Sequence, residues 1–144
     1  FYAVDARNGH LRWKSSIQAE RWFWAKPLAQ DGIIYAGALD GRVYIFNATS
    51  GEKLTDCDLG APLVSAPVWS GTNVIFATQT GEIHAIEPGQ YQPKELMASI
   101  EGEVNAPLSF SNGIIYLHAI DPDNLYLISA DTGFNMGITP LREK

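Results

Sequence analysis

Three segments of this chain repeat one another at a fixed interval, and this repeat constrains the fold more than any other feature of the sequence. Each segment runs from a proline through a polar turn into β-branched and aromatic residues, and the three span residues 27–35, 67–76 and 107–116. Their prolines, Pro27, Pro67 and Pro107, stand 40 residues apart. A second motif recurs in phase, at residues 41–46, 81–86 and 124–128, and residues 1–5 match it. Such a period is typical of repeat architectures.

Each repeat is predicted to contain four short strands. The first follows the proline, a suitable strand start because proline cannot donate to a β-ladder. The others cover residues 33–37, 42–47 and roughly 53–58, and later counterparts cover 74–78, 83–87, 114–118 and 125–129. Turn pairs such as Asp31-Gly32 and Asn112-Gly113 separate the strands, and helical periodicity is absent. Four strands per repeat predict the blades of a β-propeller.

The predicted fold is therefore all-β, a propeller fragment of about 3.5 four-stranded antiparallel blades. We place a half blade at residues 1–15, full blades at 25–58 and 64–100, and most of a further blade at 105–140, within one partial propeller spanning 1–144. Closed propellers have at least four blades, and the sequence opens inside a strand without an initiator Met or a signal peptide. We expect a longer parent chain, or self-association through the open blade faces, because water would otherwise contact large apolar surfaces.

The opening residues carry a recognisable motif. Ala3-x-Asp5-x-x-Asn8-Gly9-x-x-x-Trp13 resembles the tryptophan-docking motif of pyrroloquinoline-quinone (PQQ)-like propeller repeats, written A-x-D-x-x-T-G-x-x-x-W. The resemblance implies structural roles: Gly9 adopts a left-handed turn conformation, and Trp13 docks on the neighbouring blade. The expected structural set is Ala3, Asp5, Gly9 and Trp13.

Later copies of this motif lack the tryptophan. Thr55 stands at its position in the second copy and Gly137 in the fourth, while the third copy diverges after Glu87. A regular ring of docking tryptophans is therefore not expected along the chain.

The same resemblance raises the question of quinone catalysis. Quinone dehydrogenases of this superfamily stack PQQ on an adjacent Cys-Cys disulfide and hold Ca²⁺ with acidic and amide ligands. Cys57 is the single cysteine here, so that disulfide cannot form within this sequence. Residues 121–124 offer oxygen ligands, but Asp, Pro and Asn are ordinary turn formers. The three histidines fall in separate repeats without ligand spacing. We expect no cofactor, no metal and no catalytic residue in these residues.

Charge and hydropathy exclude two further classes. The formal net charge is −6, whereas nucleic-acid binding needs a surplus of Lys and Arg to neutralise phosphates. No apolar run approaches the ~18 residues of a membrane-spanning helix. We expect neither a nucleic-acid partner nor a direct membrane span.

One segment has an aromatic density that the repeat does not explain. Residues 21–24 read Arg-Trp-Phe-Trp and lie in a connection between blades. In an up-and-down blade this connection shares a face with the turns between second and third strands. Aromatic and arginine side chains are favoured in binding hot spots. The candidate partner-binding residues are Arg21, Trp22, Phe23, Trp24, Asp40, Arg42, Glu82, Glu101, Asp121 and Asp123. The alternative is that these rings fill the seam between blades.

We interpret the chain as a non-catalytic scaffold that binds a protein partner. It is similar to the non-catalytic, BamB-like branch of the PQQ-like repeat family, and this resemblance implies a periplasmic or other extracytoplasmic location. The leading alternative is a segment of a PQQ-dependent dehydrogenase whose catalytic residues lie outside these residues. An adjacent Cys-Cys in the full protein would favour the enzyme. A ligand-sensing receptor domain is a third possibility, which a membrane span elsewhere in the full protein would indicate.

Overall fold

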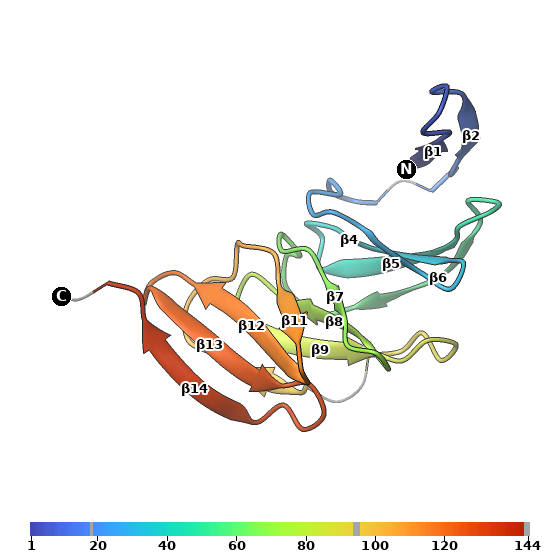
Figure 1. The fold of residues 1–144 in the computed structure, drawn as a ribbon. Coiled ribbons are helices and arrows are strands. Elements are labelled where there is room, and N and C mark those ends of the chain that lie inside the picture. Colours follow the sequence, from blue (N-terminus) through green and yellow to red (C-terminus); the bar gives the residue numbers. More distant parts are fainter. Residues whose placement is uncertain (18, 94–95, 143–144) are drawn as a thin grey trace.

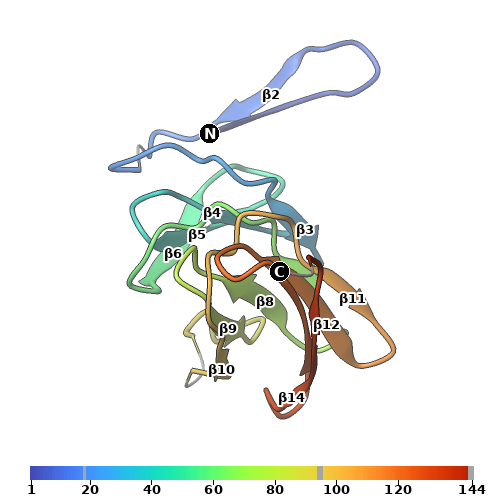
Figure 2. The same ribbon diagram turned by 90° about the vertical axis from the view of Figure 1, so that its left-hand side faces the viewer.

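The computed structural model describes residues 1–17, 19–93 and 96–142. Throughout this described part the regular secondary structure is β-strand, arranged as three four-stranded antiparallel sheets and one hairpin (Figure 1). The prediction of an all-β chain built from four-stranded blades is confirmed. Figures 1 and 2 both place the hairpin at one end of an arc and β14 at the other.

The strands follow chain order within each sheet. The hairpin consists of β1 (Tyr2–Val4) and β2 (Leu11–Lys14). The first blade consists of β3 (Leu28–Gln30), β4 (Ile33–Gly37), β5 (Arg42–Asn47) and β6 (Lys53–Asp58). The second consists of β7 (Val68–Trp69), β8 (Val74–Ala77), β9 (Glu82–Ile86) and β10 (Ala98–Ser99). The third consists of β11 (Ser109–Ser111), β12 (Ile114–Ala119), β13 (Asn124–Ser129) and β14 (Asn135–Pro140).

The sequence repeat is also a repeat of strand register. Tyr35 lies opposite Ile45 in the first blade, and the corresponding pair in the third blade is Tyr116 and Leu127. The turn from β3 to β4 has positive φ at both central residues, with 49° at Asp31 and 77° at Gly32. Paired positive φ angles define the type I′ turn, which matches the twist of antiparallel strands. The turn from β11 to β12 repeats these angles, so its residues select the same connection.

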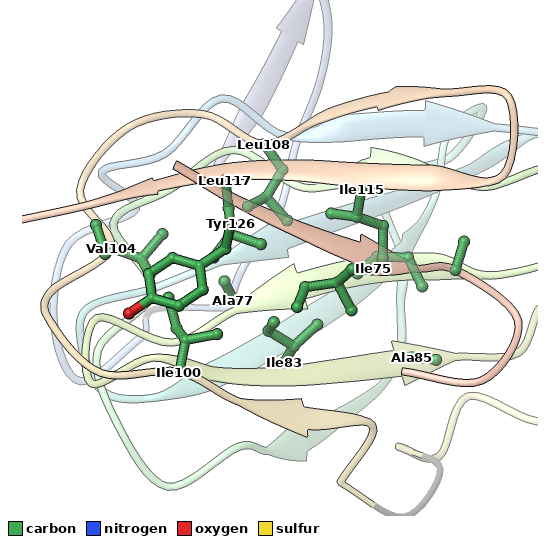
Figure 3. Close-up of a cluster of buried hydrophobic side chains, with 13 residues drawn as sticks. Ile75, Ala77, Ile83, Ala85, Ile100, Val104, Leu108, Ile115, Leu117 and Tyr126 are labelled. Carbon is green, nitrogen blue, oxygen red and sulfur yellow. The ribbon is translucent and has the colours of Figure 1, made fainter. Parts of the chain in front are cut away.

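Three apolar seams join the four units. The seam between the second and third blades is mainly aliphatic, and Figure 3 shows Ile75 and Ile83 of the second blade lying close to Ile115 of the third. The seam between the first and second blades centres on Tyr35, Leu63 and similar side chains. The seam between the hairpin and the first blade is rich in aromatic rings. Each unit therefore buries apolar surface against its neighbour rather than around one shared core.

The hairpin is held by its tryptophan. The indole Nε1–H of Trp13 donates to the carbonyl oxygen of Ala48 at 2.9 Å, across the seam in the first blade. Gly51 lies under the ring, because a Cβ added there would be 2.4 Å from a ring carbon. At the other end of the hairpin, Gly9 has a φ of 73°. Asp5 accepts the backbone N–H of Arg7 at 2.9 Å and so orders the same turn.

The innermost strands lie side by side along the concave centre of the arc, β3 beside β7 and β7 beside β11. The three repeat prolines, Pro27, Pro67 and Pro107, together line a hollow of about 520 Å³ with Lys26, Leu28 and Leu108. The residue before the proline is Lys26 in the first blade and Ala66 in the second. The repeat thus brings the same segment of each blade together at the centre of the arc.

Candidate partner-binding face

The connections between blades are fastened to the turns between second and third strands by a repeated hydrogen bond. Leu39 N–H donates to the carbonyl oxygen of Trp22 at 3.0 Å. One repeat later Gln79 N–H donates to Pro62 at 2.8 Å, and then Ile120 N–H donates to Glu103 at 2.9 Å. We call this hydrogen bond the linker clip. It places the connections and the turns on one side of the arc, the linker face, formed by residues 15–17, 19–26, 59–66 and 100–106 with turns 38–41, 78–81 and 120–123.

Residues 21–24 divide between the seam and the solvent. Phe23 packs into the aromatic seam, with its ring centroid 5.3 Å from those of Phe1 and Tyr44. Trp22 and Trp24 lie largely in solvent and are 74% and 66% exposed. Arg21 is exposed as well. The middle ring therefore anchors the segment, and the two flanking indoles remain available for contacts.

Two hollows flank Trp22. The larger, about 520 Å³, is lined by Phe1, Ile17, Ala19, Phe23 and the segment 20–22. The smaller, about 190 Å³, lies between the segment 20–22 and Leu39. A rigid aromatic side chain beside concave, partly apolar surface is the usual anatomy of a protein-binding hot spot. Sequence reasoning did not select Leu39, since its role follows only from the clip that brings its turn beside Trp22.

Asp40 fixes the turn on which this segment rests. Its carboxylate accepts the backbone N–H groups of Glu20 and Arg42, each at 3.0 Å. It also accepts the hydroxyl of Tyr44 at 2.8 Å. Burial, together with this hydrogen bond to Asp40, raises the pKa of Tyr44 to about 12, so the phenol stays protonated and remains a donor. Asp40 is therefore a positioning residue that is already satisfied within the chain.

Arg42 is engaged away from the aromatic segment. Its guanidinium pairs with Asp56 and lies 3.3 Å from Asp58, both on β6. Lys53 also pairs with Asp56. Hydrogen bonds from Lys53 and then Arg42 lower the pKa of Asp56 below its ordinary value. These contacts tie Arg42 to the outer strand of its own blade.

The remaining acidic candidates belong to the second and third blades. Glu82 begins β9, and its Oε2 lies 3.7 Å from Nε2 of His84. Glu101 is exposed, and its carbonyl oxygen accepts the Tyr126 hydroxyl at 3.0 Å. Asp121 is exposed in the turn from β12 to β13. Glu101 and Asp121 lie on the linker face two repeats away from Trp22, and Glu82 directly follows the turn one repeat away.

Asp123 joins a cluster that the sequence did not indicate. Its Oδ1 lies 2.6 Å from Nε2 of His118, and its Oδ2 lies 2.7 Å from Nε of Arg142. His118 faces the side of the third blade that no described segment covers, at the position held by Gly37 in the first blade and Ala77 in the second. The signal in the sequence was a histidine at a position where other repeats carry a small residue.

Two kinds of group bear on chemistry in the described residues, the metal-ligating side chains and the Cys57 thiol. No group of three or more His, Cys, Asp or Glu side chains among them could hold a metal ion. Burial raises the pKa of the Cys57 thiol to about 11, so it is protonated and unreactive at neutral pH. A search of the same residues for a helix that could cross a membrane finds none.

The fold and the repeated clips define the class of protein, a β-propeller of the PQQ-like repeat type. The chain belongs to the family described as outer membrane protein assembly factor BamB, whose model matches residues 1–91, more than half of the sequence. The BamB of Moranella endobia (strain PCIT) is 30% identical over 84 residues, covering 58% of this chain and 21% of that protein. The beta-alanine-activating enzyme of Mus musculus is 24% identical over 92 residues, covering 60% of this chain and 8% of that enzyme.

Solved structures show the same architecture. BamB from Moraxella catarrhalis superposes with a TM-score of 0.75 at 15% identity, covering 96% of this chain and 42% of that chain. The computationally designed protein Ika8 superposes with a TM-score of 0.80 at 20% identity, covering 99% of this chain and 44% of that chain. This chain therefore spans less than half of either structure and about a fifth or less of either curated relative. Likeness at this identity carries the fold alone.

Proposed function

We propose that this chain is a non-catalytic propeller scaffold that binds a protein partner through the linker face of its first blade. The observation that supports it most directly is the segment 21–24, in which Trp22 and Trp24 are 74% and 66% exposed although Phe23 and the linker clip hold the backbone in place. Exposed indoles on a fixed backbone bind with little loss of conformational entropy. A soluble protein gains nothing in stability from leaving them in water.

The partner, in this proposal, is a component of outer-membrane protein assembly. This rests on membership of the BamB family, whose name records that role for its relatives. An extracytoplasmic location follows from the same resemblance. Both statements concern the whole protein, because this chain covers only 21% of the BamB of Moranella endobia and 42% of the solved BamB chain.

Site-specific crosslinking tests the proposed face. A photoreactive phenylalanine analogue replaces Trp24 in the full protein expressed in its own cells, and crosslinked partners are identified by mass spectrometry. We expect crosslinks to outer-membrane assembly proteins, and none when the analogue replaces Leu54 on the rim of the same blade. Crosslinks from Leu54 but not from position 24 would refute the assignment of the face.

Alanine variants separate binding from folding. Trp22→Ala with Trp24→Ala should reduce partner crosslinking captured from a third linker-face position, Ala61, about tenfold or more, since truncated hot-spot anchors each cost at least about 2 kcal/mol. The unfolding temperature should not change, because both side chains lie in solvent. Phe23→Ala is the matched control, and it should lower the unfolding temperature because this ring packs in the seam.

The alternative function, a segment of a PQQ-dependent dehydrogenase, has a specific but distant observation in its favour, the match to an enzyme over 92 residues. It predicts quinone binding. Absorbance titration of the purified chain with PQQ, with and without Ca²⁺, distinguishes the two functions. We expect no saturable binding at micromolar concentrations, and saturation would favour the enzyme.

A further inference from the structure

The outer rims of the first and third blades occupy the same place in the fold but differ in charge. Gly51 and Gly133 mark the same turn position, and the residues one, three and five places beyond them follow the outer strands. In the first blade these are Glu52, Leu54 and Asp56, and in the third they are Phe134, Met136 and Ile138. The latter three are 70%, 55% and 52% exposed. No charged residue occurs from Gly133 to Leu141.

Charge normally protects such an edge. An outer strand presents unpaired backbone N–H and C=O groups, and charged side chains on it prevent pairing with another chain. In β6 the carboxylates of Asp56 and Asp58 are joined to Arg42 of β5, and Lys53 adds a further charge. In β14 the comparable protection is limited to Pro140, which ends the strand.

The free backbone groups of β14 can be located. Leu141 N–H donates to the carbonyl oxygen of Asp123 at 2.9 Å, so the backbone of Leu141 faces β13. Antiparallel ladders alternate between residues that face the partner strand and residues that face away. Ile138, three positions earlier and opposite Tyr126, therefore directs its N–H and C=O outward, to the edge.

We propose that β14 of one copy pairs antiparallel with β14 of a second copy, about a twofold axis at Ile138. The two Ile138 residues then exchange N–H···O bonds. Pro140 lies opposite Met136 of the second copy, where the Pro140 carbonyl accepts the Met136 N–H and the Met136 carbonyl stays in water, because proline has no N–H to donate. Each chain carries a net charge of −6, but this edge has no charged residue, so two copies can pair along it without opposed like charges.

The size of the contact sets its strength. The contact involves six strand residues and three apolar side chains of each copy. These bury less surface than the roughly 800 Å² per partner of a stable complex, so the dimer is weak. A folded partner with a large apolar interface could not bury that interface on so narrow an edge. An identical, uncharged strand matches its length and its apolar character.

Sedimentation equilibrium of the purified chain from about 10 µM to about 1 mM tests the pairing. We expect a reversible monomer–dimer equilibrium that Ile138→Lys weakens about tenfold or more, because the two new charges face one another at the axis. Met136→Lys should weaken it as well, because each copy then brings a charge to the shared edge. Leu54→Lys is the matched control: it stands at the position of Met136 on the charged rim, is 41% exposed, and should leave the dimer unchanged.

Two results would overturn the pairing. One is a strictly monomeric chain over the whole concentration range. The other is a dimer that survives Ile138→Lys but is lost in Tyr2→Lys, which would place the contact at the open face of the hairpin instead. Amide exchange at Ile138 gives a second readout, since its N–H should exchange more slowly at high concentration in the parent chain and not in Met136→Lys.

Discussion

The two end seams of the arc are closed by different chemistry. Between the hairpin and the first blade, Phe1 stacks on Phe46 with centroids 5.2 Å apart, and Trp13 adds a hydrogen bond across the seam. Between the second and third blades the contacts are mainly aliphatic, and Ile83 and Ile115 are completely buried. The docking tryptophan is present only where the aromatic seam is. Blade packing in this chain thus requires filled space at the seam, and either rings or branched aliphatic residues supply it.

The largest effect should come from the aliphatic seam. Ile83→Ala removes a fully buried side chain, and the cavity together with the lost transfer energy should cost about 3 kcal/mol of unfolding free energy. Urea denaturation followed by circular dichroism measures it. Leu54→Ala, on an exposed rim, serves as the control and should change stability by less than about 0.5 kcal/mol. Equal losses at the two sites would show that the seam is not tightly packed.

The aromatic seam should fail locally rather than globally. Trp13→Ala removes the docking ring and its hydrogen bond to Ala48, so the hairpin should detach while the blades remain folded. In hydrogen exchange we expect amide protection in β1 and β2 to fall about 100-fold, the equivalent of roughly 3 kcal/mol. Protection in β8 and β12 should be unchanged. Loss of protection throughout the chain would mean that the hairpin is not a separate unit.

Two glycines isolate the contribution of the ring contact. Gly9 and Gly51 have nearly the same backbone conformation, with φ of 73° and 75°. An added Cβ meets nothing within 4 Å at Gly9, but lies 2.4 Å from the Trp13 ring at Gly51. Gly9→Ala should cost about 1 kcal/mol for the left-handed conformation alone, and Gly51→Ala about 1 kcal/mol more for displacing the ring. Thermal unfolding of the pair measures the difference, and equal costs would refute the docking contact.

The smallest effect concerns pH and the middle seam. His84 occupies the place that Tyr44 and Tyr126 hold in the neighbouring blades. Both tyrosine hydroxyls donate hydrogen bonds, whereas Nε2 of His84 is buried without a hydrogen-bond partner and has the Glu82 carboxylate 3.7 Å away. Burial lowers the pKa of His84, although Glu82 partly opposes the shift.

The sign follows from this depressed pKa. The folded state favours neutral His84, so its contribution to stability is present above the unfolded pKa of about 6.5 and declines as pH falls through that value toward the lower folded pKa. Urea denaturation at a series of pH values from about 7.5 to about 5.5 should show this loss, and His84→Phe should remove it. A slope that survives His84→Phe would assign the dependence to other groups.

The sequence repeat predicted the fold because strand register follows it closely. The bounds of β4 and β5 agree with the prediction, and those of the later blades differ by a residue or so. The short length of β10 was not predictable. Pro88-Gly89 interrupts the repeat, so the sequence does not indicate which residues after it pair with β9.

The candidate face was harder to predict in detail. Sequence reasoning treated Trp22, Phe23 and Trp24 as one group, since nothing in their order says which ring turns inward. Burial separates them, because the seam offers Phe23 a site against Tyr44. Arg42 was selected for its position in a turn, but the pairing of β5 with β6 brings carboxylates within its reach. Both outcomes depend on contacts between strands, which a linear pattern does not specify.

The linker clip makes the unfolding of this chain cooperative along one dimension, from each unit to the next. Each clip joins one blade to the connection that precedes it, so in the described part of the chain these hydrogen bonds couple the free energies of nearest neighbours. Such a chain behaves like a short linear lattice, in which terminal units open first and interior units open last. A unit of 40 residues that begins between a connection and the turn it is clipped to carries the donor of one clip near its start and the acceptor of the next clip near its end. If such a unit is duplicated or deleted, every remaining donor still meets an acceptor. The arc then changes length without changing its local geometry.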